Sequence, residues 1–145
     1  MEVEALREKY LKQTFDEVEF RVDADDIVGF SLACGETLPR YTDKSAPDFQ
    51  APPTFTARFH GRRMLPHDLP LDGRIPLDAG KAVMPRKTIR AGAKLLGRSY
   101  LNEIYDKTGR SGRMVFLVSR MELYDEQGEI ASIVDSRMVV RERPE

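Results

Sequence analysis

The second half of the chain constrains the fold most, because it consists of extended runs separated by short turns. The expected strands are 83–89, 95–105, 114–124 and 129–141. Along the last run apolar and polar side chains alternate, which is typical of a strand with one buried face. Its apolar positions are Ile130, Val134, Met138 and Val140, and its polar positions are Glu129, Asp135, Arg137 and Arg141. Pro85 marks the first run as an edge strand or a bulge.

The last three expected strands each have about 10–12 residues, which is twice the usual strand length of about five or six. Long antiparallel strands with one apolar face must twist and curl. A curled sheet has a concave apolar face, and one helix can fill it.

The segment 51–60, Ala-Pro-Pro-Thr-Phe-Thr-Ala-Arg-Phe-His, is the candidate for that helix. Proline is tolerated in the first turn of a helix, where its missing N–H would be unpaired anyway. Phe55 and Phe59 are four residues apart and therefore share one face. So short a helix is unstable in water by itself, and it would need the apolar face of the sheet. The alternative is a surface loop that carries two phenylalanines.

The residues before this segment predict two helices and a strand. Residues 2–13 are a polar helix with a thin apolar stripe, which we interpret as part of a peripheral arm over residues 1–14. The stripe consists of Val3, Leu6 and Tyr10. Residues 15–22 alternate as a half-buried strand does. Asp23 is a good N-cap for a helix over about 24–34.

Gly35 suits the left-handed position that follows such a helix, and Cys34 is interpreted as a small apolar residue on its buried face. Residues 35–50 and 61–80 are rich in proline, glycine or polar residues and predict irregular structure. A loop of that length in a compact domain is often functional.

Together these elements predict a single α+β domain over residues 1–145, in which a long antiparallel sheet wraps around a central helix. This order of elements is that of a hot-dog fold. The second possibility is a cone-shaped α+β barrel of the NTF-like kind, which also places helices before a curved meander.

Composition excludes several other classes of protein. Apolar residues make up 41% and charged residues 32%, as in soluble globular domains. The net charge of −1 gives no strong attraction to nucleic acid or to a membrane surface. No run approaches the roughly 20 apolar residues of a membrane span. The single cysteine cannot form an internal disulfide, and the first residues do not resemble a signal peptide, so we expect a cytoplasmic protein.

Four segments carry a resemblance to a known family. They are Gly35–Asp43, Ala51–Phe55, Tyr105–Phe116 and Asp125–Glu129. Over residues 15–142 the chain resembles MaoC-like dehydratases and (R)-specific enoyl-CoA hydratases, and within them the fatty-acid-synthase-type dehydratase N-terminal subfamily. The resemblance implies a hot-dog protein that acts on acyl-CoA thioesters, with no cofactor beyond the CoA of the substrate.

The active members of that family carry a loop of the form Gly-Asp-x-Asn-Pro-x-His. In this chain Glu36 stands at the Asp position, Leu38 at the Asn position and Tyr41 at the His position. Histidine suits acid–base work because its pKa lies near neutral pH, whereas a phenol with a pKa of about 10 is a poor base. The resemblance therefore implies a degenerate catalytic loop, with Glu36 and Tyr41 as the remaining catalytic candidates.

Three functions are open from the sequence. The first, which we favour, is the accessory subunit of a hydratase whose partner carries the intact Asp/His loop. The second is a self-contained hydratase that uses Glu36 with Tyr41 or with His60, since His60 and His67 are the only histidines. The third is a non-enzymatic module that binds acyl thioesters or other lipidic ligands.

The resemblance also implies substrate-binding positions. From the two family segments these are Leu38, Pro39, Pro53, Thr54 and Phe55, and among the basic residues near turns they are Arg86, Lys87, Arg110 and Arg113. Arginine binds phosphate in a forked geometry, which suits the phosphates of CoA. One cysteine and two histidines in separate contexts predict no metal site. The long sheet edges predict a homodimer, or a heterodimer with an Asp/His-loop subunit.

Overall fold

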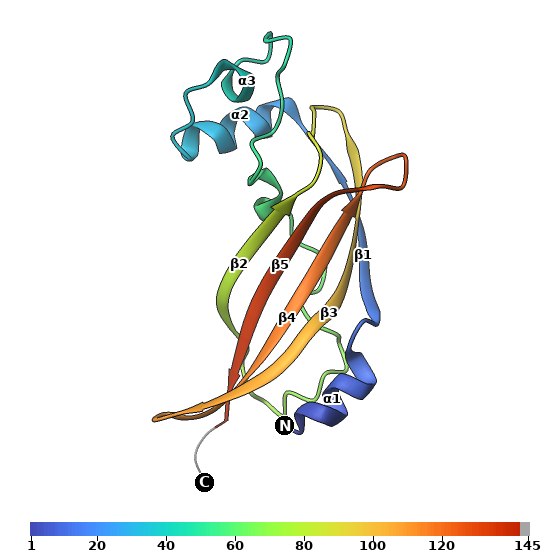
Figure 1. The fold of residues 1–145 in the computed structure, drawn as a ribbon, viewed down its shortest axis with the longest axis vertical. Helices are drawn as coiled ribbons and strands as arrows, with labels where there is room; N and C mark the ends of the chain where they lie inside the picture. Colours follow the sequence, from blue (N-terminus) through green and yellow to red (C-terminus); the bar gives the residue numbers. More distant parts are fainter. Residues whose placement is uncertain (143–145) are drawn as a thin grey trace.

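The extended runs of the second half form most of one sheet. In the computed structural model, which describes residues 1–142, five antiparallel strands lie in the order β1-β3-β4-β5-β2 (Figure 1). They are β1 (Thr14–Arg21), β2 (Leu77–Pro85), β3 (Lys94–Gly109), β4 (Gly112–Tyr124) and β5 (Ile130–Arg141). The predicted α+β class with a long antiparallel sheet is confirmed. The sheet is open, with β1 and β2 at its edges, so the cone-shaped barrel is not adopted.

The predicted strand boundaries were least accurate at β2. We expected residues 83–89, but the strand begins at Leu77 and ends at Pro85. Beyond it, buried Ile89 lies in a loop, where its carbonyl accepts a 2.8 Å hydrogen bond from the N–H of Ala51. Proline cannot donate to a ladder, which explains why the strand stops there and why it lies at an edge.

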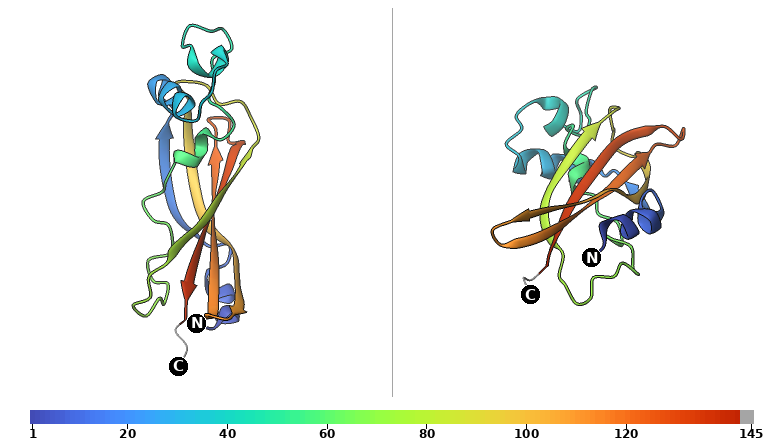
Figure 2. Two further views of the ribbon diagram at one scale, coloured as in Figure 1. Left: turned by 90° about the vertical axis from the view of Figure 1, so that its left-hand side faces the viewer. Right: turned by 60° about the horizontal axis from the view of Figure 1, so that its bottom comes forward.

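Strands β3 and β4 form the longest hairpin, which twists strongly along its length (Figure 2). Gly109 pairs with Gly112, so the connecting turn is only Arg110 and Ser111. Gly112 has a φ of 101°, a conformation that favours glycine.

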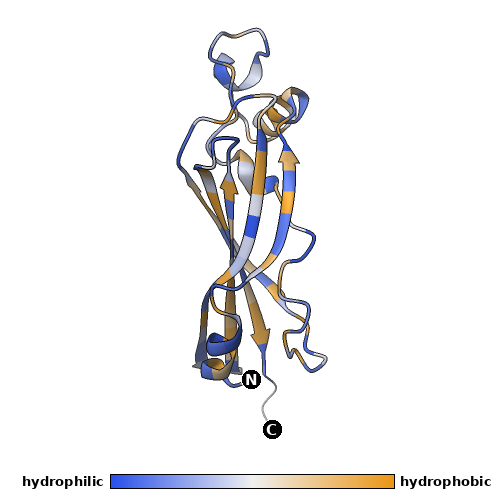
Figure 3. Ribbon diagram, turned by 90° about the vertical axis from the view of Figure 1, so that its right-hand side faces the viewer, coloured by the Kyte–Doolittle hydropathy of each residue, from blue (hydrophilic) through white to orange (hydrophobic). Residues whose placement is uncertain are grey.

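Buried and less buried side chains alternate along much of the strands, so the two faces of the sheet differ (Figure 3). One of them, the inner face, carries two apolar clusters. The upper cluster combines Leu95, Met121, Leu123 and Val134 with residues of the segment 49–59 and of helix α2 (Ala24–Ala33). The lower cluster combines Leu101, Ile104, Val115, Leu117 and Val140 with helix α1 (Val3–Tyr10).

The expected central helix is much shorter than its segment. Only Phe55–Arg58 is helical, as the single 3₁₀ turn η1, and Phe59 is already extended. The physical reason is that a helix this short depends on what it packs against, and Phe59 leaves the turn in an extended conformation with its ring stacked on that of Phe20 in β1. The two phenylalanines nevertheless have the expected role. Phe55 and Phe59 are buried, and their rings meet edge to face with 5.5 Å between centroids. The segment therefore packs on the sheet and is not a surface loop.

Helix α2 and the one-turn helix α3 (Pro39–Thr42) lie together beyond one end of the sheet (Figure 1). Asp23 caps α2 by accepting a 2.7 Å hydrogen bond from the N–H of Asp25, and Gly35 has the expected positive φ of 78°. The prediction for Cys34 was wrong. It is the C-cap residue of α2 and is exposed, because the last turn of α2, in which Leu32 and Ala33 are exposed too, extends beyond the sheet (Figure 1).

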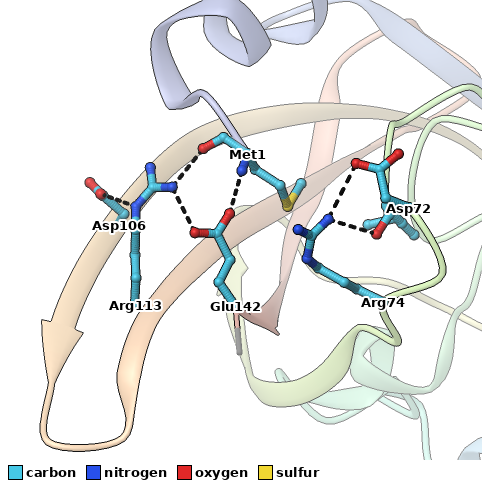
Figure 4. A network of polar contacts seen from close by, with 7 residues as sticks. Met1, Asp72, Arg74, Asp106, Arg113 and Glu142 are labelled. Carbon is cyan, nitrogen blue, oxygen red and sulfur yellow. Dashed lines mark hydrogen bonds and ion pairs between the residues drawn. The ribbon is translucent and has the colours of Figure 1, made fainter. Parts of the chain in front are cut away.

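Helix α1 packs more closely than a peripheral arm would. Its stripe residues Val3, Leu6 and Tyr10 are buried in the lower cluster, and the Tyr10 hydroxyl donates a 2.8 Å hydrogen bond to the carbonyl of Asp68. Around its start, Glu142 pairs with the N-terminal amine and accepts a 2.9 Å hydrogen bond from Arg113 (Figure 4). The expected arm is thus a packed element at the lower end of the sheet.

Candidate functional site

The degenerate loop positions lie in the α2–α3 layer. Glu36 is half-buried just after α2, and its backbone N–H donates to the carbonyl of Ser31. Leu38 is 50% exposed at the N-cap of α3, Pro39 is exposed in its first turn, and Tyr41 is half-buried within it. No side-chain hydrogen bond joins Glu36 to Tyr41 within residues 1–142. The structure therefore brings the two residues into one layer without pairing them.

The positions around η1 divide into surface and core. Pro53 and Thr54 are exposed, whereas Phe55 has no exposed surface. The adjacent Thr56 is buried too, and a 2.8 Å hydrogen bond joins its hydroxyl to that of Ser132 on β5. Phe55 is thus a core residue that fixes η1 to the sheet.

The basic candidates are not gathered at one place. Arg86 and Lys87 follow the end of β2, whereas Arg110 and Arg113 belong to the β3–β4 hairpin at the other end of the sheet (Figure 1).

Two of these four side chains already have acidic partners. Lys87 pairs with Asp125 at 3.1 Å and also with Glu129. Arg113 donates hydrogen bonds of 2.8 Å to Asp106 and 2.9 Å to Glu142 (Figure 4), and these raise the pKa of Arg113. Arg86 and Arg110 are exposed and make no ion pair in the described part of the chain.

A groove of about 320 Å³ lies where η1 and the following irregular segment meet strands β2 and β5. Its lining consists of Ala57, His60, Met64, Asp78, Gly80, Lys81, Ser136 and Met138. Of these, only His60 was a candidate from the sequence. The groove exposes basic and apolar groups together.

Lys81 enters the groove because strand β2 contains a bulge. Asp78 pairs with Met138 and Lys81 with Ser136, so three steps along β2 oppose two along β5. Residues three apart on a regular strand lie on opposite faces. The extra residue therefore puts Asp78 and Lys81 on the same face. Gly80 has the required positive φ of 121°, and it was the one signal in the sequence that could have indicated a bulge.

Lys81 and His60 contact each other in the groove. The Lys81 ammonium donates a 2.8 Å hydrogen bond to the carbonyl of Ala57, and its Nζ lies 3.3 Å from His60 Nδ1. Burial lowers the pKa of Lys81, which the charge of Asp78 partly offsets. Burial, and then the charge of Lys81, lower the pKa of His60 below 6.5. At neutral pH the imidazole is therefore uncharged.

Serine side chains cross the inner face beside the groove, between the two apolar clusters. Ser99, Ser119 and Ser136 come from β3, β4 and β5, and with His60 and Met64 they line a narrow extension of about 10 Å³. Ser99 and Ser119 are only 4% and 6% exposed. The strand patterns predicted half-buried runs but did not single out these serines, because serine is common on either face.

Two kinds of site find no support in the part of the chain that the structure describes. Within residues 1–142 no three histidine, cysteine, aspartate or glutamate side chains gather closely enough to hold a metal ion. In the same range no helix combines the length and apolar character of a membrane span.

Comparison with known proteins gives a family match. The sequence matches the model of the FAS1-like dehydratase domain region over residues 11–134. A search of the curated proteins finds no match to it.

Solved structures share the fold at low sequence identity. The MaoC-like dehydratase from Rhodospirillum rubrum is 22% identical, with 97% of this chain and 98% of that chain covered and a TM-score of 0.61. The C-terminally truncated HadBC (3R-hydroxyacyl-ACP dehydratase) complex from Mycobacterium tuberculosis is 18% identical, with 89% and 99% covered and a TM-score of 0.61. The ChsH1–ChsH2 complex from Mycobacterium tuberculosis is 16% identical, with 99% and 90% covered and a TM-score of 0.66. The predicted hot-dog fold is confirmed by these matches.

Proposed function

This chain belongs to the family of the FAS1-like dehydratase domain region, and from that premise we propose that it acts in the reversible hydration of an enoyl-CoA thioester as the accessory subunit of a hydratase. The observation that carries the proposal is the loop at Glu36–Tyr41. Its position after α2 fits the family resemblance, but it has a tyrosine where a hydratase needs an imidazole.

The inner face supports a role in holding substrate. The open groove and the serine-lined extension lie between the two apolar clusters. An acyl chain needs an apolar lining, and Met64 and Met138 can adapt to one because methionine is flexible. Arg86 and Arg110, which lie at opposite ends of the sheet, are alternative candidates for the phosphates of CoA, since neither is held by an acidic side chain within residues 1–142.

The names of two structural relatives support partnering. HadBC and ChsH1–ChsH2 are complexes. We propose that this chain similarly joins a second hot-dog subunit, which would supply the Asp/His loop. A homodimer is the alternative assembly.

Reconstitution tests the accessory role. The purified chain is assayed on crotonyl-CoA and on longer enoyl-CoA substrates, alone and with candidate subunits that carry an intact Asp/His loop. We expect little hydration by the chain alone. When the chain is added to the right partner, the hydration rate of that partner, or the length of the acyl chain that it accepts, should change. Partners whose activity never changes would contradict the role. Binding of acyl thioesters without turnover in any assembly would favour the binding module.

The neutral His60 in the groove supports a second candidate, a self-contained hydratase. An uncharged imidazole can accept a proton, and Glu36 or Tyr41 could assist it. The variants Glu36→Gln, Tyr41→Phe and His60→Gln are compared with the parent chain in the absence of any partner. If the lone chain is the enzyme, loss of an acid–base group should slow it about 100-fold or more. Hydration rates equal to that of the parent chain in all three variants would exclude this candidate.

A further inference from the structure

Lys81 makes no ion pair within residues 1–142, although Asp78 also lines the groove, whereas Lys9 and Lys87 each make one. Lys9 lies 3.1 Å from Asp68 and Lys87 lies 3.1 Å from Asp125. Lys81 has only the Ala57 carbonyl and His60 Nδ1 in hydrogen-bond range among residues 1–142. The side chain is exposed, but its ammonium is held in place by the Ala57 carbonyl, so an anion in the groove meets a positioned cation.

The groups at this end of the groove are hydrogen-bond donors. Lysine has only donors, so His60 Nδ1 must accept from it, and the other ring nitrogen then carries the proton. The ammonium and the imidazole N–H therefore favour a ligand that accepts hydrogen bonds.

The serines beside the groove add polar groups. Ser99, Ser119 and Ser136 line the extension, but their hydroxyls are not buried groups without a partner, since within residues 1–142 only Ser31 Oγ is one. The extension, at about 10 Å³, has room for about one water molecule. Such a water could join the serine hydroxyls to a polar ligand in the groove.

The other residues that line the groove determine which kind of anion it favours. Met64, Met138 and Ala57 give the groove an apolar wall, which suits a carbon chain. Asp78 also lines the groove, and its negative charge disfavours a dianion such as phosphate more than a single carboxylate.

We infer that the groove between η1 and strands β2 and β5 binds a carboxylate carried on a short apolar chain. The carboxylate lies at Lys81 and His60, and the chain lies against Met64 and Met138 toward the serines. This goes beyond the proposed function, because the site needs neither a partner subunit nor catalysis. The carboxylate comes from a free acid or from the far end of an acyl thioester.

Titration of the lone chain with butyrate, followed by NMR, tests the site. Butyrate should shift the imidazole signals of His60. The Lys81→Met variant should bind it about tenfold more weakly or worse, since a charged hydrogen bond is lost. Lys81→Arg should retain the binding of butyrate. The binding of 1-butanol, which has no charge, should be the same in the parent chain and in Lys81→Met. The matched control is Lys107→Met, which removes a lysine from the β3–β4 hairpin.

Two thioesters identify the source of the carboxylate. Succinyl-CoA has a terminal carboxylate and butyryl-CoA does not. If the terminal carboxylate of a thioester is the natural ligand, succinyl-CoA binds about tenfold or more tightly than butyryl-CoA, and Lys81→Met removes the difference. If a free acid is the ligand, only butyrate depends on Lys81. Should neither butyrate nor succinyl-CoA binding depend on Lys81, the inference is overturned, whatever the outcome of the hydratase assays.

Discussion

Two side chains decide the chemistry of the groove. Lys81 and His60 are 21 residues apart in sequence and meet with 3.3 Å between Nζ and Nδ1. Both have lowered pKa values, for which burial is the largest cause. The charge of Lys81 adds to the effect of burial on the pKa of His60, and an anion bound between the two groups would offset it.

The pKa of His60 should rise when the charge of Lys81 is removed. In Lys81→Met burial remains but the repulsion is lost, so an NMR pH titration should give a His60 pKa closer to 6.5 than in the parent chain. The charged groups that line the site with His60 are Lys81 and Asp78 in the groove and Arg63 in its extension. Lys107→Met is the matched control and should leave the value unchanged. An unaltered His60 pKa in Lys81→Met would show that the two groups do not interact in solution.

The lowered pKa of His60 also makes the stability of the fold depend on pH. A histidine with a lowered pKa in the folded state binds its proton more readily in the unfolded chain. Its contribution to stability is complete above the unfolded pKa of about 6.5 and is lost as the pH falls through that value toward the folded pKa. The effect in Lys81→Met should be smaller, because the folded pKa then lies nearer the unfolded one.

Among the elements, η1 shows that a single helical turn is enough to pack on the apolar face of the sheet. Its four residues are fixed by the buried ring of Phe55 and by the hydrogen bond between Thr56 and Ser132. The sequence correctly indicated the aromatic pair, because spacing and hydrophobicity are local properties. It overestimated the helix, because the length of a helix depends on what the neighbouring segments cover.

Truncation of Phe55 should be costly. Because the ring is fully buried, Phe55→Ala should lower the free energy of unfolding by about 3–5 kcal/mol. Leu38→Ala is the control and should change it by less than about 0.5 kcal/mol, since Leu38 is 50% exposed. Urea unfolding followed by circular dichroism measures both. Equal effects of the two substitutions would show that η1 does not pack on the sheet in solution.

For the molecule as a whole, the sheet has open edges, and one of them is strand β2. β2 pairs with β5 along one side, and along its other side no strand pairs with it in the described part of the chain. An open edge invites another chain, so we expect dimerisation through β2, either with a second copy or with the Asp/His-loop subunit.

Proline substitutions at two neighbouring β2 residues test this edge. The N–H groups of Ala82 and Val83 point to opposite sides of the strand. One proline therefore removes a bond to β5 and should lower the melting temperature. The other should remove only an outward N–H, leaving the melting temperature nearly unchanged while weakening dimerisation about tenfold, as measured by sedimentation equilibrium. If neither substitution alters the mass of the species in solution, β2 is not the edge that pairs.

The sequence by itself determined the class of fold, the long strands, the capped helix after Asp23 and the family, because alternation, capping and turn residues act over a few neighbouring positions. The tertiary structure alone decided where the basic residues lie, that α1 is packed, and that Lys81 meets His60. Those outcomes depend on strand register, and one extra residue at Gly80 is enough to move a side chain from one face of the sheet to the other.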